Sequence, residues 1–268
     1  MRWEELSGDR FIEAVEECEH VCLVPLSVIE RHGHHLPMGT DMFIGREICR
    51  RAAELEPVII FPDYIFTQIN EGRHLAGTIA IDENLMLNLL DNICREISRN
   101  GLKKIVLVNS HGGNQGLVAL FNMLQLYSPR DYIVYLVDLV TLCFEGKVET
   151  PWELSSDGHA GPTETSIVQA IRPELVAIEK LPAGAEGKAL NRLQSLQNAG
   201  VQTGISWYAD HPTHYQGDAS TATAETGKRI QETGAQALAR AVRAIKQDTV
   251  SKRLLDEFYG ASRAPLGQ

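Results

Sequence analysis

The sequence predicts an α/β fold in which helices cover both faces of a mainly parallel β-sheet. Short apolar segments alternate with longer segments whose apolar residues recur every three or four positions, as in amphipathic helices. The apolar segments are continuous, which is typical of parallel strands that are buried on both faces. The 268 residues, 44% hydrophobic and 22% charged, have the composition of a soluble globular protein with one large or two small domains.

The first part of the chain predicts helix, strand, helix and strand in turn. Ser7 precedes a segment of helical period, so we expect a capped helix there. The run VCLVPL at 21–26 predicts a buried strand. We expect Asp41 at or near the N-terminus of the next helix, and residues 57–61 predict a second strand.

The middle of the chain continues this alternation. Residues 84–100 have one apolar face and end at Asn100-Gly101, a common helix stop. KIVLVN at 104–109 is the clearest strand, and a helix from about Leu117 and a strand at 132–137 follow it. Ligand sites in such folds lie at the carboxyl ends of the strands, so the segments after residues 26 and 109 are the first places to search.

The last part of the chain has fewer regular segments. After Val140 the pattern is irregular until Pro162, which suits the first turn of a helix that ends before Pro173. Residues 181–222 predict a long ordered excursion with little regular structure, and a final amphipathic helix starts near Ala224. We expect the tail to be loose or to dock on a neighbouring subunit. The absence of repeats, low-complexity tracts and linkers predicts a single domain, residues 1–268.

Composition restricts the partners. A net charge of −10 and a pI near 5.4 exclude nucleic acid or an anionic membrane surface as the main partner, since both require a basic surface. A small neutral or polar substrate fits this charge. We expect a cytoplasmic protein, since there is no apolar run of about 18 residues and no apolar signal segment. The five scattered cysteines are expected to be buried reduced thiols.

The segment PLSVIERHGHHLPMGTD, residues 25–41, carries the strongest chemical signal. Glu30 and His32 project to the same side of an extended segment, and the loop can fold Asp41 against them. Oxygen and imidazole ligands without thiolate suit Zn, Mn or Fe(II) in a hydrolytic site. The alternative is that the carboxylates cap helices and the histidines are ordinary surface or core residues, which is the commoner case for any one of them alone.

Two further patches carry similar residues. His111 follows the clearest strand and precedes Gly112-Gly113, which could instead cradle a phosphate or, with Ser110, indicate a serine hydrolase. Neither signal is strong, because the phosphate-loop ending and the GxSxG elbow are missing. In DGHAGPTETS, His159 precedes the start of a helix and Glu164 lies in the first turn of that helix. Glu164 could be a metal ligand, a proton shuttle or only a partner of the helix dipole.

The chain resembles the creatininase family in three motifs, SVIERHGHHLPMGTD, VNSHGGN and DGHAGPTETS. GRHLAGT and GDASTATAETGK resemble the family more weakly. The resemblance covers roughly residues 20–175. It implies a single-domain three-layer α/β/α sandwich, two divalent metal ions (Zn, Mn or Fe) per subunit and a homo-oligomer, often a hexamer. Known members open the cyclic amide of creatinine, hydrolyse a formamide, trim a modified peptide or open a keto-inositol ring.

The resemblance also implies a ligand set. Glu30, Asp41 and His111 resemble the ligands of one metal, while His32 and a bridging Asp41 resemble those of the second. Creatininase has a glutamate two places after the histidine that corresponds to His111, where this chain has Gly113. Glu164 is our candidate to replace it, and the difference makes creatinine itself a less favoured substrate.

The expected mechanism is attack by a metal-bridging hydroxide on an amide-type carbonyl, with His159 protonating the departing nitrogen or steadying the tetrahedral intermediate. The candidate substrate contacts are His34, His74, Trp152 and Asp157. His20, His211 and His214 are assigned by default to the surface or to interfaces. The alternatives are hydrolytic C–C ring opening of a keto-inositol, formamide hydrolysis, and a metal-binding protein without catalysis.

Overall fold

The computed structural model describes residues 1–144, 148–181 and 186–267. A four-stranded sheet of order β2-β1-β3-β4, parallel at every pairing, forms its centre. Its strands are β1 (Val21–Leu26), β2 (Ile59–Ile60), β3 (Lys104–Asn109) and β4 (Ile133–Asp138). The described helices are α1 (Gly8–Glu17), α2 (Thr40–Leu55), α3 (Glu83–Arg99), α4 (Gln115–Leu124), α5 (Leu139–Phe144), α6 (Pro162–Ile171), α7 (Gln194–Asn198), α8 (Ser206–Asp210), α9 (Ala224–Gln247) and α10 (Ser251–Ser262).

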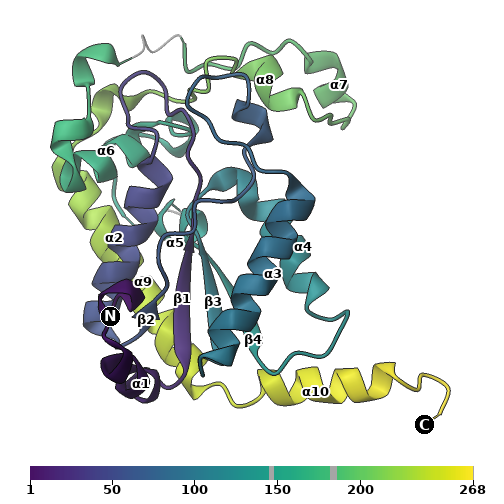
Figure 1. Cartoon of the computed structure of the whole chain (residues 1–268). Coiled ribbons are helices and arrows are strands. Elements are labelled where there is room, and N and C mark those ends of the chain that lie inside the picture. The colour runs from purple at the N-terminus through teal and green to yellow at the C-terminus, as the bar shows by residue number, and fades with distance from the viewer. Residues whose placement is uncertain (145–147, 182–185, 268) are drawn as a thin grey trace.

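Helices cover both faces of the sheet, which confirms the predicted three-layer α/β/α fold (Figure 1). The side chains of β1 alternate between the two faces. Val21 and Leu23 pack with α2, α6 and α9, while Cys22 and Val24 pack with α1, α3 and α4. Both faces of the sheet are therefore buried under helices, and this explains why the strand sequences are continuously apolar.

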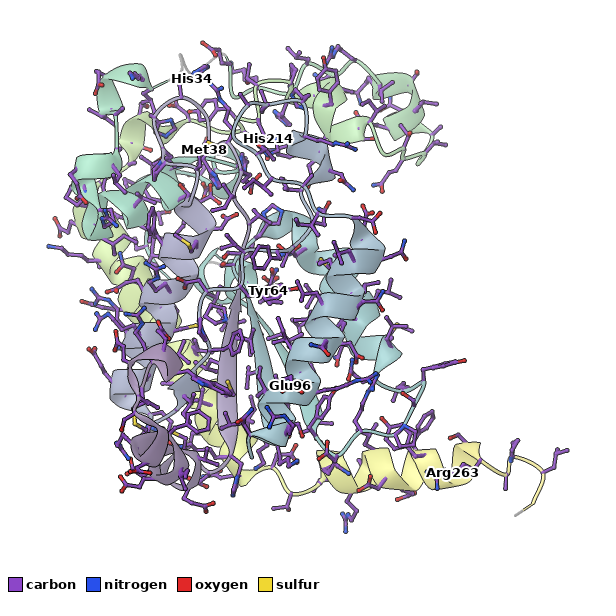
Figure 2. All side chains as sticks on the ribbon, viewed as in Figure 1. His34, Met38, Tyr64, Glu96, His214 and Arg263 are labelled. Atoms are coloured by element: carbon purple, nitrogen blue, oxygen red, sulfur yellow. The ribbon has the colours of Figure 1, made fainter. Side chains whose placement is uncertain are left out.

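The carboxyl ends of the strands all lie at one edge of the sheet. The loops that follow β1 and β3 gather there, and residues 186–222 extend over the same edge (Figure 1). Figure 2 shows His214 and Met38 among these loops, whereas Tyr64 lies lower, beside the sheet. This edge is the place where the sequence predicts the site.

Some predicted elements differ in extent. The strand predicted at 57–61 contains only β2, because Pro57 and Pro62 flank it and lack the N–H that a ladder needs. The excursion predicted at 181–222 contains the short helices α7 and α8 and a 3-10 turn at Ala219–Thr221, and its residues 182–185 lie outside the described residues. Residues 145–147 of the irregular stretch after Val140 also lie outside them.

Of the two expectations for the tail, a loose tail is wrong, and docking on a neighbouring subunit stays a prediction. Residues 251–262 form α10, and Leu255 and Tyr259 are buried against the same chain. The Tyr259 hydroxyl donates to the carbonyl oxygen of Gln125, just past α4. All five cysteines are buried, as expected. Within the described residues, no helix is both long enough and apolar enough to span a bilayer.

Candidate metal centre

The sheet places two of the predicted ligands side by side. Leu26 at the end of β1 pairs with Asn109 at the end of β3, so the chain leaves the two strands next to each other. Glu30 lies four residues beyond β1 and His111 two residues beyond β3. Asp41 comes from a third direction, in the first turn of α2, where the helix dipole favours a carboxylate.

Glu30, Asp41 and His111 form the first cluster, and all three are buried. His111 Nδ1 lies 2.8 Å from Glu30 Oε1 and 3.2 Å from Asp41 Oδ2. Glu30 Oε1, Asp41 Oδ2 and His111 Nε2 nevertheless have no hydrogen-bond partner within the described structure. Buried polar atoms are nearly always satisfied, so three such donor atoms in one cluster are suited to binding a cation.

His32, His159 and Glu164 form the second cluster. His32 Nε2 lies 3.3 Å from Asp41 Oδ1 and 3.7 Å from Glu164 Oε2, and it too has no hydrogen-bond partner among the described residues. The His32 and His159 ring centroids are 4.3 Å apart. Asp41 thus faces His111 with one oxygen and His32 with the other.

The protonation of these groups reflects their burial and mutual charges. Burial alone would lower the pKa of His32, but Asp41 and Glu164 outweigh it and raise this pKa to about 10. Burial, assisted by Asp41, raises the pKa of Glu164 to about 8 against the opposing charge of His32. Burial holds the pKa of His159 well below its usual range, so this ring is neutral.

The charges in the first cluster follow the same logic. Although burial opposes it, the charge of His111 and the hydrogen bond from His214 hold the pKa of Glu30 well below its usual range. Burial also opposes ionisation of His111, but Glu30 and Asp41 raise its pKa well above the usual value. Protons on His32 and His111 therefore balance part of the negative charge of the carboxylates. A divalent ion can take the place of these protons, and the O and N donors without sulfur suit Zn, Mn or Fe.

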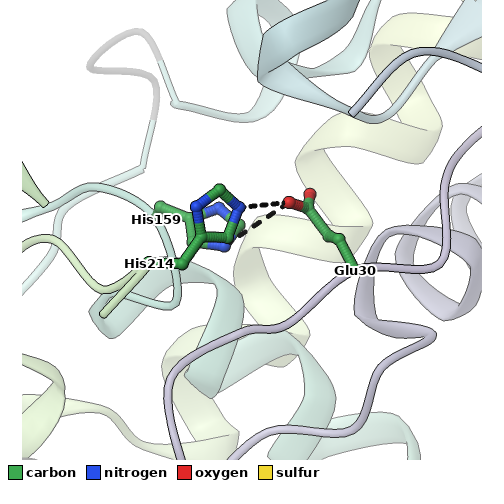
Figure 3. A group of neighbouring side chains, drawn as sticks. All are labelled: Glu30, His159 and His214. Carbon is green, nitrogen blue, oxygen red and sulfur yellow. Dashed lines mark hydrogen bonds and ion pairs between the residues drawn. The ribbon is translucent and has the colours of Figure 1, made fainter. Parts of the chain in front are cut away.

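His214 joins the site, contrary to the sequence-based assignment. The prediction that His211 and His214 lie at the surface is wrong, since both are buried and His214 is only 2% exposed. His214 Nε2 lies 2.6 Å from Glu30 Oε2, and His159 Nε2 lies 3.8 Å from the same oxygen (Figure 3). The sequence signal that could have indicated this is the concentration of Trp207, His211, His214 and Tyr215 in an otherwise polar, small-residue segment.

A cavity of about 490 Å³ opens beside both clusters. Its lining comprises Glu30, Glu71, His111, Gly112, Gly113, Val140, Asp157, Gly158, His159, Glu164, Trp207, His214 and Gln216. The volume is in the usual range for small-molecule sites. Trp207, which is not among the predicted site residues, forms part of the wall.

The four predicted substrate contacts are placed differently from one another. Asp157 lines the cavity, but its Oδ1 also accepts the amides of Gly158 and Thr163 at the start of α6. His34 is exposed and contacts Arg31, and Figure 2 shows it at the outer edge of the loops. His74 is exposed and contacts the carbonyl oxygen of Pro212, while Trp152 is buried in the core.

A sequence model of the family Creatininase, described as creatinine amidohydrolase, matches residues 4–242. The chain belongs to the creatininase family. It is 31% identical over 222 residues to the mycofactocin precursor peptide peptidase of Mycobacterium ulcerans (strain Agy99), with 78% of each protein covered. It is 25% identical over 195 residues to the creatinine amidohydrolase of Pseudomonas putida, covering 66% of this chain and 74% of that protein.

A solved structure described as "Creatininase Mn" superposes with a TM-score of 0.77 at 22% identity, covering 92% of this chain and 99% of that one. At this identity the likeness shows the creatininase fold. The names amidohydrolase and peptidase state that the two relatives above hydrolyse amide bonds. The predicted family and fold are thereby confirmed.

Proposed function

We propose that this creatininase-family protein is a divalent-metal-dependent hydrolase of a cyclic amide or another non-peptide C–N bond in a small polar substrate. In this proposal Glu30, Asp41 and His111 hold one ion, and His32, Asp41 and Glu164 hold a second. The observation that carries it is Asp41, one of whose oxygens faces His111 in the first cluster while the other faces His32, whose Nε2 has no hydrogen-bond partner among the described residues, in the second. When bound, such ions polarise a carbonyl group and lower the pKa of a water molecule toward ~7.

His159 is the group that moves the proton. Its Nε2 lies 2.9 Å from the carbonyl oxygen of Arg31, which can only accept, so Nε2 carries the hydrogen. In the neutral ring Nδ1 then holds the free lone pair. His159 lines the cavity, so Nδ1 can take a proton during attack on the carbonyl and deliver it to the departing nitrogen.

Glu164 and Asp157 keep this wall of the cavity in place. Glu164 Oε2 accepts the amide of Ala160 at 2.6 Å, which fixes the carboxylate in the first turn of α6. Asp157 accepts the amide of Gly158, in the loop before this helix, and the amide of Thr163 in its first turn. We infer that Asp157 holds the His159-bearing loop on α6, and that a substrate group reaches it only from the cavity side.

The decisive experiment combines metal analysis with turnover. Protein stripped of metal and reloaded with Zn, Mn or Fe(II) is expected to bind two ions per chain and to hydrolyse at least one compound in a panel of cyclic amides, formamides and keto-inositols. Asp41→Ala is expected to lose both ions and activity, and His159→Gln to lose turnover while keeping metal. Asp63→Asn, a carboxylate paired with Arg46 outside the site, is the matched control.

Two results would contradict the proposal: wild-type protein without divalent metal, or Asp41→Ala with unchanged metal content and turnover. Activity on keto-inositols alone would favour C–C ring opening instead. We also propose a cytoplasmic homo-oligomer, with a hexamer favoured by the family resemblance, and light scattering on the purified protein measures its mass directly.

A further inference from the structure

Trp207 fixes the proton position on His214. Trp207 is the second residue of α8, and its Nε1 lies 2.8 Å from His214 Nδ1. An indole N–H can only donate, so Nδ1 must be the acceptor and the single ring proton must lie on Nε2. The heavy-atom positions therefore define the tautomer of His214.

His214 in turn occupies one oxygen of Glu30. Its Nε2–H points at Glu30 Oε2 over 2.6 Å, and an ionised carboxylate can only accept (Figure 3). Glu30 Oε1 is left without a hydrogen bond and faces His111 in the first cluster. The contacts thus form a chain from Trp207 through His214 to Glu30, and it ends at the oxygen that is available to a cation.

His214 adopts a backbone conformation that is unfavourable for a residue with a Cβ. Its φ of 55° is in the left-handed region, although the residue is not glycine. Two backbone hydrogen bonds hold it there: its amide donates to His211, and its carbonyl oxygen accepts from Gly33 in the loop between β1 and α2. Strain of this kind persists where the surroundings determine it, and here it directs a buried imidazole at Glu30.

We propose that Trp207 and His214 are positioning residues that aim Glu30 at the first metal ion, and that His214 is not itself a ligand. His214 lies within ligand distance of Glu30 and His159, but in this tautomer neither of its nitrogens has a free lone pair. Outer partners of this type orient a ligand and change metal affinity. The inference rests on the proposed metal-dependent function.

The same pair links the metal site to the cavity wall. Trp207 and His214 both line the cavity, and the Trp207 ring lies edge-on to His159 with centroids 6.0 Å apart. A substrate that moves the indole also moves the hydrogen bond that orients Glu30. Metal affinity and substrate binding are therefore coupled through these two side chains.

The first test measures metal binding in matched variants. Trp207→Phe removes the N–H donor, His214→Leu removes the link to Glu30, and His214→Gln keeps a donor of similar reach. We expect the first two to weaken Co(II) and Zn(II) affinity about 10–100-fold, with an altered Co(II) absorption spectrum, and His214→Gln to recover part of the loss. Tyr208→Phe, the neighbouring aromatic residue of α8, is expected to bind metal as the wild type does.

The second test needs no metal. In metal-free protein, long-range ¹H–¹⁵N spectra of the histidine rings are expected to show His214 protonated at Nε2, and this signature should change in Trp207→Phe. A proton on Nδ1 would overturn the inference, as would wild-type metal affinity in both Trp207→Phe and His214→Leu. Loss of one whole metal equivalent in both His214 variants would make His214 a ligand. If the tautomer is as expected but the wild type binds no metal, the proposed function fails instead.

Discussion

Gly227 in α9 provides the sharpest test of how the site is supported. It lies where α9 crosses α6, the helix that carries Glu164 in its first turn. A Cβ at residue 227 would overlap the backbone carbonyl group of Ser166 and would lie only 2.8 Å from the nitrogen of Ile167. Because backbone atoms cannot rotate away, Gly227→Ala must push the two helices apart.

The expected size follows from the local contacts. Helix propensity favours alanine over glycine by about 1 kcal/mol, whereas overpacking costs about 1–3 kcal/mol. Two hydrogen bonds flank the contact, from the Thr223 amide to Ser166 Oγ and from Gln231 Nε2 to the Ile167 carbonyl oxygen, and their loss costs about 1 kcal/mol each. Gly227→Ala should therefore lower the free energy of unfolding by roughly 2–4 kcal/mol.

Chemical denaturation and differential scanning calorimetry measure this change. At about 2–4 °C per kcal/mol for a chain of this size, Tm should fall by roughly 5–15 °C. Gly260→Ala is the matched control, because Gly260 lies in α10 and a Cβ there would meet no atom within 4 Å. It should stabilise the protein by up to about 1 kcal/mol. A Gly227→Ala protein as stable as the wild type would refute the close-contact argument.

Three further predictions concern the site and the tail. Gly113→Ala would place a Cβ 2.6 Å from His111 Nε2, so we expect about 10-fold weaker metal binding in titrations with little change in stability. Removal of metal with a chelator should lower the Tm of the wild type, because a bound ion stabilises the native state. The Tm of Asp41→Ala should not change in the same thermal scans, because this variant is expected to bind no ion. Asp248→Ala should cost about 1 kcal/mol at pH 7, because its carboxylate accepts two amides at the start of α10. Hydrogen bonds, chiefly from Ser251, lower the pKa of Asp248 in the folded protein. The contribution of its carboxylate to the free energy of unfolding is therefore full above pH ~4 and is lost as the pH falls through the folded-state pKa. Urea titrations at several pH values measure this change.

The sheet and most of the candidate ligands could be predicted because their signals are local. VCLVPL and KIVLVN are short, continuous apolar runs, a pattern typical of strands that a parallel sheet buries on both faces. Glu30, His32 and Asp41 lie within twelve residues of one another, so one loop gathers them without any knowledge of the tertiary structure. The tail also carries a readable helical signal, since Leu255 and Tyr259 are four residues apart, on one helical face.

The contact of His214 with Glu30 could not be predicted, because the aromatic and histidine residues around His214 mark the segment but do not indicate what it packs against. His214 lies 184 residues from Glu30 in the sequence, in a segment without helical or strand period. Only the path of residues 206–216 over the sheet edge brings it to the carboxylate. The histidine-rich loop, by contrast, predicts a substrate contact at His34. That side chain is exposed, because its neighbour His35 is the residue that points inward and contacts Thr165.

The site is thus built from two sources that differ in rigidity. The proposed ligands lie in the loops that follow β1 and β3 or in the first turns of α2 and α6, while Trp207, His214 and Gln216 on the cavity wall come from the long segment between α6 and α9, which has little regular structure. Such a segment can change in sequence and alter the cavity without moving a candidate ligand, which suits a family whose members act on different substrates. The His214 hydrogen bond to Glu30 limits this freedom, because a change near Trp207 that alters substrate preference should also alter metal affinity.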